Sequence, residues 1–215
     1  MNDLADRRRE EKERRRDEIL AAALHVAAAG FDSLTLDQVA RQARLSRALI
    51  YVYFTDKDDL QFALCERALQ RLAVAFRQTS APGVTGRDRL AGMGRAYVAF
   101  AIEDPVSFEV LARCEARDTA TMPTGRNVEA CILRSDEVHE LLLDALRAGV
   151  ADRSIRDTIG DADAVATVLW GFIHGVIQIA ATKGALLERR NVSSEHLFEQ
   201  ALELAVRALS PPGAP

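Results

Sequence analysis

The amino-acid sequence predicts an all-α protein in which a three-helix N-terminal domain precedes a larger C-terminal helical bundle. Apolar residues recur at helical spacing along nearly the whole chain, whereas the alternating pattern typical of β-strands is scarce. With 215 residues and 48% hydrophobic content, the chain can form one large domain or two small ones with a packed core. The stretch 79–86, which contains Pro82 and two glycines, is the best candidate for a domain boundary.

The N-terminal elements are predicted to be short and closely spaced. A first helix covers 13–29 and stops at Gly30, which suits a left-handed C-cap. Thr35 offers its hydroxyl as the N-cap of a helix over 36–43, and a second short helix covers 47–54. Asp56 resembles the N-cap of a longer helix that runs through Ala75.

Five further helices are predicted beyond the boundary, at 87–103, 105–114, 126–148, 162–183 and 193–209, with Pro105 at a helix start. The stretches 119–125 and 149–160 are predicted loops. The tail 210–215 is too rich in proline to continue a helix and is predicted to be disordered. The predicted domains are therefore an arm and three-helix domain over 1–57, a connecting helix over 58–78, a bundle over 79–209 and the tail.

Composition and charge narrow the class of protein. Three cysteines without a C-x-x-C pair argue against a disulfide framework and favour a reducing, cytoplasmic setting. The N-terminus lacks the apolar segment of a signal peptide. The apolar run 165–181 is shorter than the roughly 20 residues that span a bilayer, so a soluble protein without a membrane partner is expected. Residues 1–57 carry 11 Lys and Arg against 10 Asp and Glu, and the rest carries 17 against 22, which is compatible with nucleic-acid binding but does not indicate it.

Residues 34–57 have the pattern of a helix-turn-helix motif, with two short helices, a tight turn and one shared apolar core. Val39 and Ala40 point inward from the first helix, and Ile50 and Phe54 from the second. The outward face of the second helix then carries a cation, small apolar groups and phenols, which suit guanine edges, thymine methyls and phosphates. These outward residues are Arg47, Ala48, Tyr51, Val52 and Tyr53.

The string F-D-S-L-T-L-D-Q-V-A-R-Q-A-R-L-S-R-A-L-I-Y-V-Y-F-T-D-K-D-D-L, at Phe31–Leu60, closely resembles the DNA-binding head of regulators of the tetracycline-repressor (TetR) family. The resemblance implies a sequence-specific transcriptional regulator that binds double-stranded DNA. It also implies DNA-binding residues, which contact base edges or the nearby backbone, hold phosphate, or orient a helix end toward the DNA. These residues are Thr35, Ser46, Arg47, Ala48, Tyr51, Val52, Tyr53 and Lys57. Family members usually have Gly where this chain has Arg44. A left-handed Arg44 would cost about 1 kcal/mol, which a phosphate contact could offset, so Arg44 joins the predicted DNA-binding residues.

The arm Arg7–Glu18 allows two interpretations. Its first arginines, Arg7–Arg9, could enter the minor groove or follow phosphates. Alternatively, ion pairs such as Glu10–Arg14 and Glu11–Arg15 could support a solvated helix. Both can hold if the arm orders only on DNA.

The resemblance also implies an effector pocket and a dimer interface in the C-terminal bundle. Independently, the helix over 162–183 is apolar nearly all round and needs cover on two sides. The last helix has two apolar rows, so the pair could form a four-helix dimer interface, with a self-covered monomer as the alternative. The residues predicted at the interface are Gly171, Gly175, Ile179, Phe198, Leu202 and Leu209.

Aromatic and adaptable side chains on the middle helices predict a pocket for a lipophilic small molecule, although each of them could be ordinary core. The predicted ligand-binding residues are Met93, Tyr97, Phe100, Phe108, Cys114, Met122, Cys131, Trp170 and His174. His174, inside an apolar helix, needs a partner, either a ligand group or a buried acceptor.

No enzyme, cofactor or metal site is predicted. Asp136 and His139 share a helical face but no second pair accompanies them, and no phosphate loop or nucleophile elbow can be identified. The favoured interpretation is a cytoplasmic homodimeric repressor that a small lipophilic ligand releases from a palindromic operator. The alternatives are an activator, a regulator without a ligand, or a helical ligand carrier or enzyme with a degenerate head.

Overall fold

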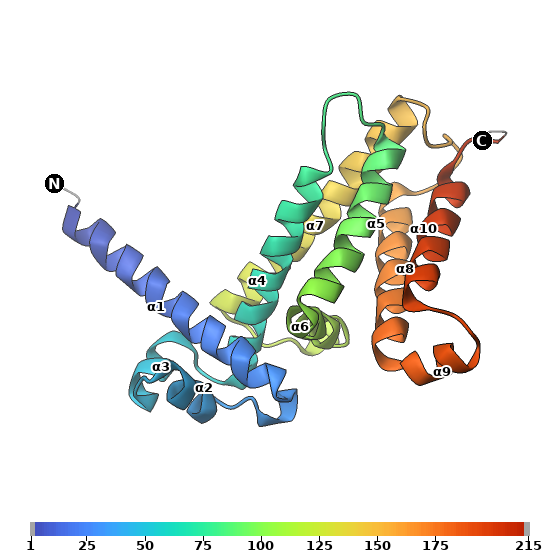
Figure 1. Ribbon diagram of the computed structural model, residues 1–215. Helices are drawn as coiled ribbons and strands as arrows, with labels where there is room; N and C mark the ends of the chain where they lie inside the picture. Colours follow the sequence, from blue (N-terminus) through green and yellow to red (C-terminus); the bar gives the residue numbers. More distant parts are fainter. Residues whose placement is uncertain (1–2, 213–215) are drawn as a thin grey trace. The chain divides into compact units, whose positions relative to one another are not determined.

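The computed structural model describes residues 3–212, which form ten α-helices and two short 3-10 helices without a strand (Figure 1). The predicted all-α class is confirmed. The chain divides into two compact units, Met1–Ala68 with Glu109–Ile132 and Leu69–Phe108 with Leu133–Pro215. These units are defined by which residues pack together, whereas the predicted domains are defined by their expected functions. The predicted domain limits therefore stay a prediction.

The first unit contains α1 (Asp3–Ala28), η1 (Phe31–Ser33), α2 (Leu36–Ala43), α3 (Arg47–Tyr53) and the beginning of α4 (Lys57–Gln78). The second half of α1 packs on α2, while its first half extends beyond that helix (Figure 1). The core of the three-helix head is apolar and fully buried, with Ile19, Leu20, Leu34, Val39, Ile50, Phe54 and Leu60 at its centre. Asp56 accepts a hydrogen bond from the amide of Asp59 at 2.8 Å, as predicted for a residue that caps α4.

The start of α1 corrects the predicted helix boundary, because the helix begins at Asp3 and not at residue 13. The predicted Glu11–Arg15 pair is present at 3.6 Å. Arg14 pairs with Glu11 and Glu18 and not with Glu10 as predicted. The sequence could not decide whether the arm is helical, because charged residues of both signs are interleaved along it and leave no apolar face. The opposite charges are nevertheless three and four residues apart, which suits ion pairs along a helix.

The segment 109–132 belongs to the first unit although it is distant in sequence from the head. It contains the end of α6 (Pro105–Glu115), η2 (Thr119–Thr121) and the start of α7 (Arg126–Ala151). Asn127, buried in this segment, donates to Asp59 at 2.7 Å and accepts from Arg16 at 3.1 Å. A polar bridge therefore joins α7 to both α4 and α1 within this unit.

The second unit contains α5 (Gly86–Glu103), α8 (Ala162–Thr182), α9 (Gly184–Arg189), α10 (Ser194–Leu209) and the remaining parts of α4, α6 and α7. Helices α5, α8 and α10 pack against one another (Figure 1). The side chains of Thr85, Asp161 and Ser193 cap three of these helices by accepting amide hydrogen bonds. A Cβ at Gly86 would collide with the backbone of Gly149, so the start of α5 needs glycine to approach the end of α7.

One additional helix and one further boundary differ from prediction. Helix α9 lies where no element was predicted, and α7 continues to Ala151 into the predicted loop 149–160. In the predicted disordered tail, the amide of Ser210 donates to the carbonyl of Val206 at 3.0 Å and closes α10. The tail residues 213–215 lie outside the described residues.

Candidate nucleic-acid interface and ligand cavity

Helix α3 presents its outward face because its inward residues are anchored in the head. Ile50 and Phe54 are fully buried, while Tyr51 and Val52 are 49% and 69% exposed. Ser46 caps the helix by accepting a hydrogen bond from the amide of Leu49 at 3.2 Å. The structure therefore places Arg47, Ala48, Tyr51 and Val52 together on an exposed surface.

The turn before α3 contains Arg44 in the left-handed conformation, with φ 56° and ψ 40°. The amides of Arg44 and Leu45 close the end of α2 by donating to the carbonyls of Arg41 and Ala40. A residue with a Cβ pays about 1 kcal/mol or more for this conformation. The Arg44 side chain is exposed.

Arg47 is held by an acidic residue of the neighbouring helix. Its Nε lies 2.6 Å from Oδ1 of Asp37, in the first turn of α2. Asp37 thus interacts favourably with the dipole at the N-terminus of α2 and also pairs with the guanidinium of Arg47 on the exposed face of α3. This ion pair orients Arg47 and links α2 to α3. The sequence predicted that the two helices are neighbours, but it could not predict which of their side chains meet.

Two other predicted residues, Thr35 and Lys57, have structural roles in the free protein. Thr35 caps α2 by accepting from the amide of Gln38 at 3.2 Å. The ammonium of Lys57 donates to the carbonyl of Phe31 at 3.3 Å. Tyr53 and Lys57 are half-buried. A lysine ammonium has three donors, so this bond leaves Lys57 able to meet a phosphate as well.

A basic hollow lies beside α1 in the same unit. It is lined by Arg8, Arg9, Lys12, Glu13, Arg16 and Arg126. Glu13 pairs with Arg9 at 3.1 Å and offsets part of the charge. The prediction for the arm concentrated on residues 7–9, and it missed Arg126, which only the fold brings to this surface.

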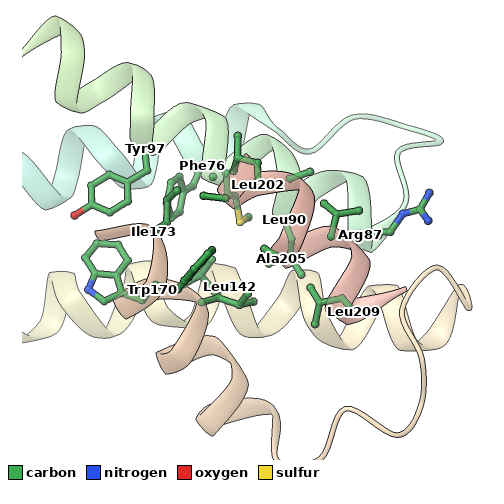
Figure 2. A pocket seen from close by; sticks show the side chains of 17 residues that line it. Phe76, Arg87, Leu90, Tyr97, Leu142, Trp170, Ile173, Leu202, Ala205 and Leu209 are labelled. Atoms are coloured by element: carbon green, nitrogen blue, oxygen red, sulfur yellow. The ribbon is translucent and has the colours of Figure 1, made fainter. Parts of the chain in front are cut away.

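The second unit contains an apolar cavity between α4, α5, α7, α8 and α10 (Figure 2). Tyr97 and Trp170 lie at one end, and Arg87 and Leu209 lie at the other. The cavity is lined by Phe76, Arg87, Leu90, Ala91, Met93, Gly94, Tyr97, Leu142, Leu169, Trp170, Phe172, Ile173, Ala201, Leu202, Ala205, Val206 and Leu209. Its volume of about 50 Å³ is far below the roughly 300–1,000 Å³ of pockets that hold drug-sized ligands.

An aromatic cluster closes one end of the cavity. The rings of Tyr97 and Trp170 are stacked with centroids 4.7 Å apart. The Tyr97 hydroxyl is hydrogen-bonded to Nδ1 of His174 at 2.7 Å in the interior. Burial lowers the pKa of His174 below its ordinary value, because desolvation disfavours the charged form of the ring. His174 therefore has the buried partner that the sequence demanded.

The structure brings together only part of the predicted ligand-binding set. Met93, Tyr97 and Trp170 line the cavity. Phe100, Phe108 and His174 do not line it, but the ring centroid of each lies within 6.4 Å of the Tyr97 centroid. The remaining three, Cys114, Met122 and Cys131, belong to the first unit and do not line this cavity.

Two residues predicted at the dimer interface line the cavity as well, namely Leu202 and Leu209. Sequence periodicity marked both as apolar positions of the last helix. It could not distinguish a row that faces the bundle's own cavity from a row that faces a partner. The lining residues from α4 and α7, Phe76 and Leu142, were not predicted, because each looks like ordinary core in the sequence.

Helix α8 has a long apolar face that the chain itself leaves uncovered. Of its 21 residues only Ala166, His174 and Ile177 are buried, and Ile179 is 47% exposed. A Cβ at Gly171 would meet no atom within 4 Å, and the same is true of Gly175. The expectation that no apolar segment is long enough to cross a membrane is wrong, because α8 is long and apolar enough to do so by length and composition alone. Val168 and Phe172 of α8 and Leu204 of α10 are exposed as well, whereas Phe198 is buried.

Comparison with known proteins places both parts of the chain. A family model described as bacterial regulatory proteins of the tetR family matches residues 19–64. A model described as the C-terminal domain of tetracyclin repressor-like proteins matches residues 90–205. The HTH-type transcriptional regulator HbdR of Aromatoleum sp. (strain CIB) is 41% identical over 58 residues, which are 26% of this chain and 25% of that protein. The match thus spans only about a quarter of this relative's length.

Solved structures resemble the whole chain. A protein of unknown function from Rhodococcus sp. RHA1 has a TM-score of 0.72 at 24% identity, covering 92% of this chain and 96% of that one. The transcriptional regulator FadR of Bacillus subtilis, solved in complex with stearoyl-CoA, has a TM-score of 0.68 at 18% identity, covering 89% and 98%. At such identities the likeness shows the fold alone.

Proposed function

The chain belongs to the tetR family of bacterial regulatory proteins, and we propose that it is a homodimeric repressor that a small lipophilic ligand releases from a palindromic operator. The observation that carries this proposal is the exposed face of α3, with a cation, a phenol and small apolar groups on a helix that is anchored by the fully buried Ile50. We place its action in the bacterial cytoplasm, where operator DNA lies, and we propose no catalytic activity.

On DNA, α3 enters the major groove. Tyr51, Val52 and Ala48 meet base edges and thymine methyls, and Arg47, oriented by Asp37, meets a guanine edge or a nearby phosphate. Lys57 and Tyr53 hold phosphate next to the groove. The exposed cation Arg44 adds a phosphate contact from the turn, with Ser46 and Thr35 at helix N-termini that favour anions.

The apolar face of α8 supports a dimer. A helix that is apolar on two sides needs cover, and a second copy of the same face supplies it around a two-fold axis. Gly171 and Gly175, where the monomer leaves space for a side chain, would allow two backbones to approach closely. Paired recognition helices then read two half-sites, which is why the operator is expected to be palindromic.

The apolar cavity of the second unit is the proposed effector site. Its lining favours a lipophilic molecule, and Arg87, at the end opposite Tyr97 and Trp170 (Figure 2), would suit an anionic group that extends past the apolar residues. The Nε of Arg87 is buried without a hydrogen-bond partner among the described residues, although it lies 3.8 Å from Oδ1 of Asp88. FadR of Bacillus subtilis, which shares the fold, was solved with stearoyl-CoA. An amphiphile with a long apolar part would suit the apolar lining here too, once the helices had moved apart to enlarge the cavity.

Release follows from differential affinity. The ligand binds one dimer geometry more tightly than the other, and the operator prefers the geometry that the ligand disfavours, so each weakens the other's binding by the same factor. Helix α4 begins at Lys57 beside the DNA-binding elements and carries Phe76, which lines the cavity. It is therefore a continuous element through which ligand binding can affect the head.

Binding to duplex DNA tests the regulator proposal. In fluorescence anisotropy at near-physiological salt, we expect the protein to bind its promoter region at least about 10³-fold more tightly than random duplex. Tyr51→Ala should weaken specific binding about tenfold by removing a base-edge contact, with Tm unchanged because the side chain is half exposed. Val74→Ala, a change at an equally exposed apolar residue of α4, is the control.

Equal affinity for promoter and random duplex would overturn the regulator proposal and favour a ligand carrier. Loss of the thermal transition in Tyr51→Ala would show that Tyr51 is a core residue. A ligand that strengthens promoter binding would contradict the release step in particular.

A further inference from the structure

Asn127, the second residue of α7, is a buried polar residue of the first unit. Its side-chain nitrogen donates to Oδ1 of Asp59 on α4 at 2.7 Å, and its side-chain oxygen accepts from the guanidinium of Arg16 on α1 at 3.1 Å. A carboxylate can only accept hydrogen bonds and a guanidinium can only donate them, so an uncharged side chain between the two must both donate and accept. The amide of Asn127 meets both requirements, so its two bonds fix which way it points.

The first branch of this network reaches the backbone at the end of α3. Oδ2 of Asp59 accepts a hydrogen bond from the amide of Thr55 at 3.0 Å. Thr55 directly follows Phe54, the C-cap of α3. One oxygen of Asp59 therefore holds the exit from α3, while the other holds Asn127. A change at position 127 acts on the link between α3 and α4 through a single carboxylate.

The second branch reaches the same place through Arg16. Its guanidinium lies 6.0 Å from the centre of the Phe54 ring, which is fully buried. Glu66 on α4 lies 3.9 Å from the same guanidinium and, together with Asn127, holds it. The two branches thus converge on consecutive residues, Phe54 and Thr55, and Asn127 is the point at which they meet.

A second link joins the same segment, 109–132, to α4 and differs in where it ends. Arg117 pairs with Asp58 at 2.8 Å, and its guanidinium lies 5.0 Å from the centre of the Phe62 ring. Both partners belong to α4. This link therefore anchors the segment on α4, whereas the link through Asn127 continues to the end of α3.

We propose that Asn127 is a positioning residue for α3, which fixes the C-terminal end of that helix and so the orientation of its exposed face. Helix α3 has only seven residues, which are too few for its own hydrogen bonds to hold it firmly. Its N-terminal end is held by the Ser46 cap and by the ion pair of Arg47 with Asp37. The network centred on Asn127 supplies the corresponding restraint at the other end.

Asn127→Asp tests this restraint with and without DNA, because the restraint exists in the free protein and only its effect on DNA binding rests on the proposed function. The change leaves two carboxylates opposite each other. A carboxylate in the first turn of α7 suits the dipole of that helix, so the protein should still fold. In the free protein, hydrogen–deuterium exchange of the segment 47–55 should become about tenfold faster, because a buried bond that restrains it is lost. Promoter binding, measured by anisotropy at near-physiological salt, should become about tenfold weaker.

Exchanging the two facing side chains should rescue the network. Asp59→Asn alone leaves one of the facing donors without an acceptor, so it should resemble Asn127→Asp. In the double variant, Asp59→Asn with Asn127→Asp, the amide at position 59 accepts from Thr55 and donates to the carboxylate at position 127, which accepts from Arg16. Each hydrogen bond and the net charge are retained. Exchange of 47–55 and promoter affinity should therefore return to within about twofold of the wild-type values.

The matched control is Asp58→Asn, which weakens the link through Arg117 but leaves both branches to α3 in place. It should change neither the exchange of 47–55 nor promoter affinity. Wild-type exchange in Asn127→Asp, a double variant no better than the single one, or an equal loss in Asp58→Asn would overturn the role of Asn127. If the wild-type protein shows no preference for the promoter, the regulator proposal fails, and the exchange rates still decide the role of Asn127.

Discussion

At the scale of single residues, each unit contains pairs that cross between its elements. Arg47 is oriented by Asp37, Lys57 closes onto the carbonyl of Phe31, and His174 is satisfied by Tyr97. Helical periodicity was enough to predict which residues of α3 face outward, because the buried positions of one short helix leave a single outward face. It could not predict these pairs, since each joins residues whose separation depends on how two elements pack.

Arg44 is the residue whose backbone conformation the sequence could anticipate and whose cost can be measured. Arg44→Gly should stabilise the free protein by about 0.5 kcal/mol, because relief of the left-handed conformation outweighs the greater chain entropy of glycine. Unfolding in urea followed by circular dichroism measures the change. If Arg44 contacts phosphate, the same variant should bind operator more weakly.

The matched control is Arg153→Gly, at a second exposed arginine with a left-handed backbone, φ 64°. It lies in the second unit, so it should gain similar stability without any loss of operator affinity. A less stable Arg44→Gly protein would show that the arginine side chain itself supports the turn.

At the scale of elements, caps and periodicity predicted most of the helices, and they failed where both were weak. Helix α9 has six residues without a side-chain cap, which is too short for an apolar period to be visible. The arm has no apolar period either, and the ion pairs along α1 are exposed, so its helical start depends on many small contributions. A helix held by such weak contributions becomes more stable when a partner neutralises part of its charge.

The arm gives a prediction about salt dependence. Arg8 and Lys12 line the basic hollow and make no ion pair within residues 3–212. Neutralising both with glutamine should weaken operator binding and reduce the slope of log K against log salt by about 1–2, if each meets a phosphate. Anisotropy titrations at several salt concentrations measure this slope.

Arg14→Gln on the same helix is the control, because Arg14 is engaged by Glu11 and Glu18. It should leave the slope unchanged. An unchanged slope in the double variant would show that the arm is a solvated helix without a DNA contact.

At the scale of the whole molecule, the sequence predicted a cavity and an uncovered apolar face but not which helix rows form each. Leu202 and Leu209 line the cavity, although their row on the last helix is as apolar as one that would meet a partner. Cys114 and Cys131, similar in the sequence to cavity residues, lie in the other unit. The assignment depends on helix rotation about the axis, which a pattern of apolar residues leaves open.

The uncovered face of α8 predicts a dimer that one charge can break. Val168 is 68% exposed, so Val168→Glu should leave the monomer folded. It should weaken the dimer at least about tenfold, because the carboxylate loses water without a partner. Analytical ultracentrifugation measures the dissociation constant, and Ile102→Glu on α5, at 64% exposure, is the control. A dimer of unchanged strength would place the interface elsewhere.

The small volume of the cavity has a kinetic consequence. A ligand larger than about 50 Å³ enters only when the helices have moved apart, so its association rate levels off at the opening rate however much ligand is present. If opening costs about 1.4 kcal/mol, about a tenth of the molecules are competent, and every ligand binds about tenfold more weakly than its contacts alone would give. The threshold of the response is then a property of the protein as much as of the ligand. Small-to-large exchanges at Ala201 or Ala205 could move it in either direction, by filling the closed cavity or by wedging it open.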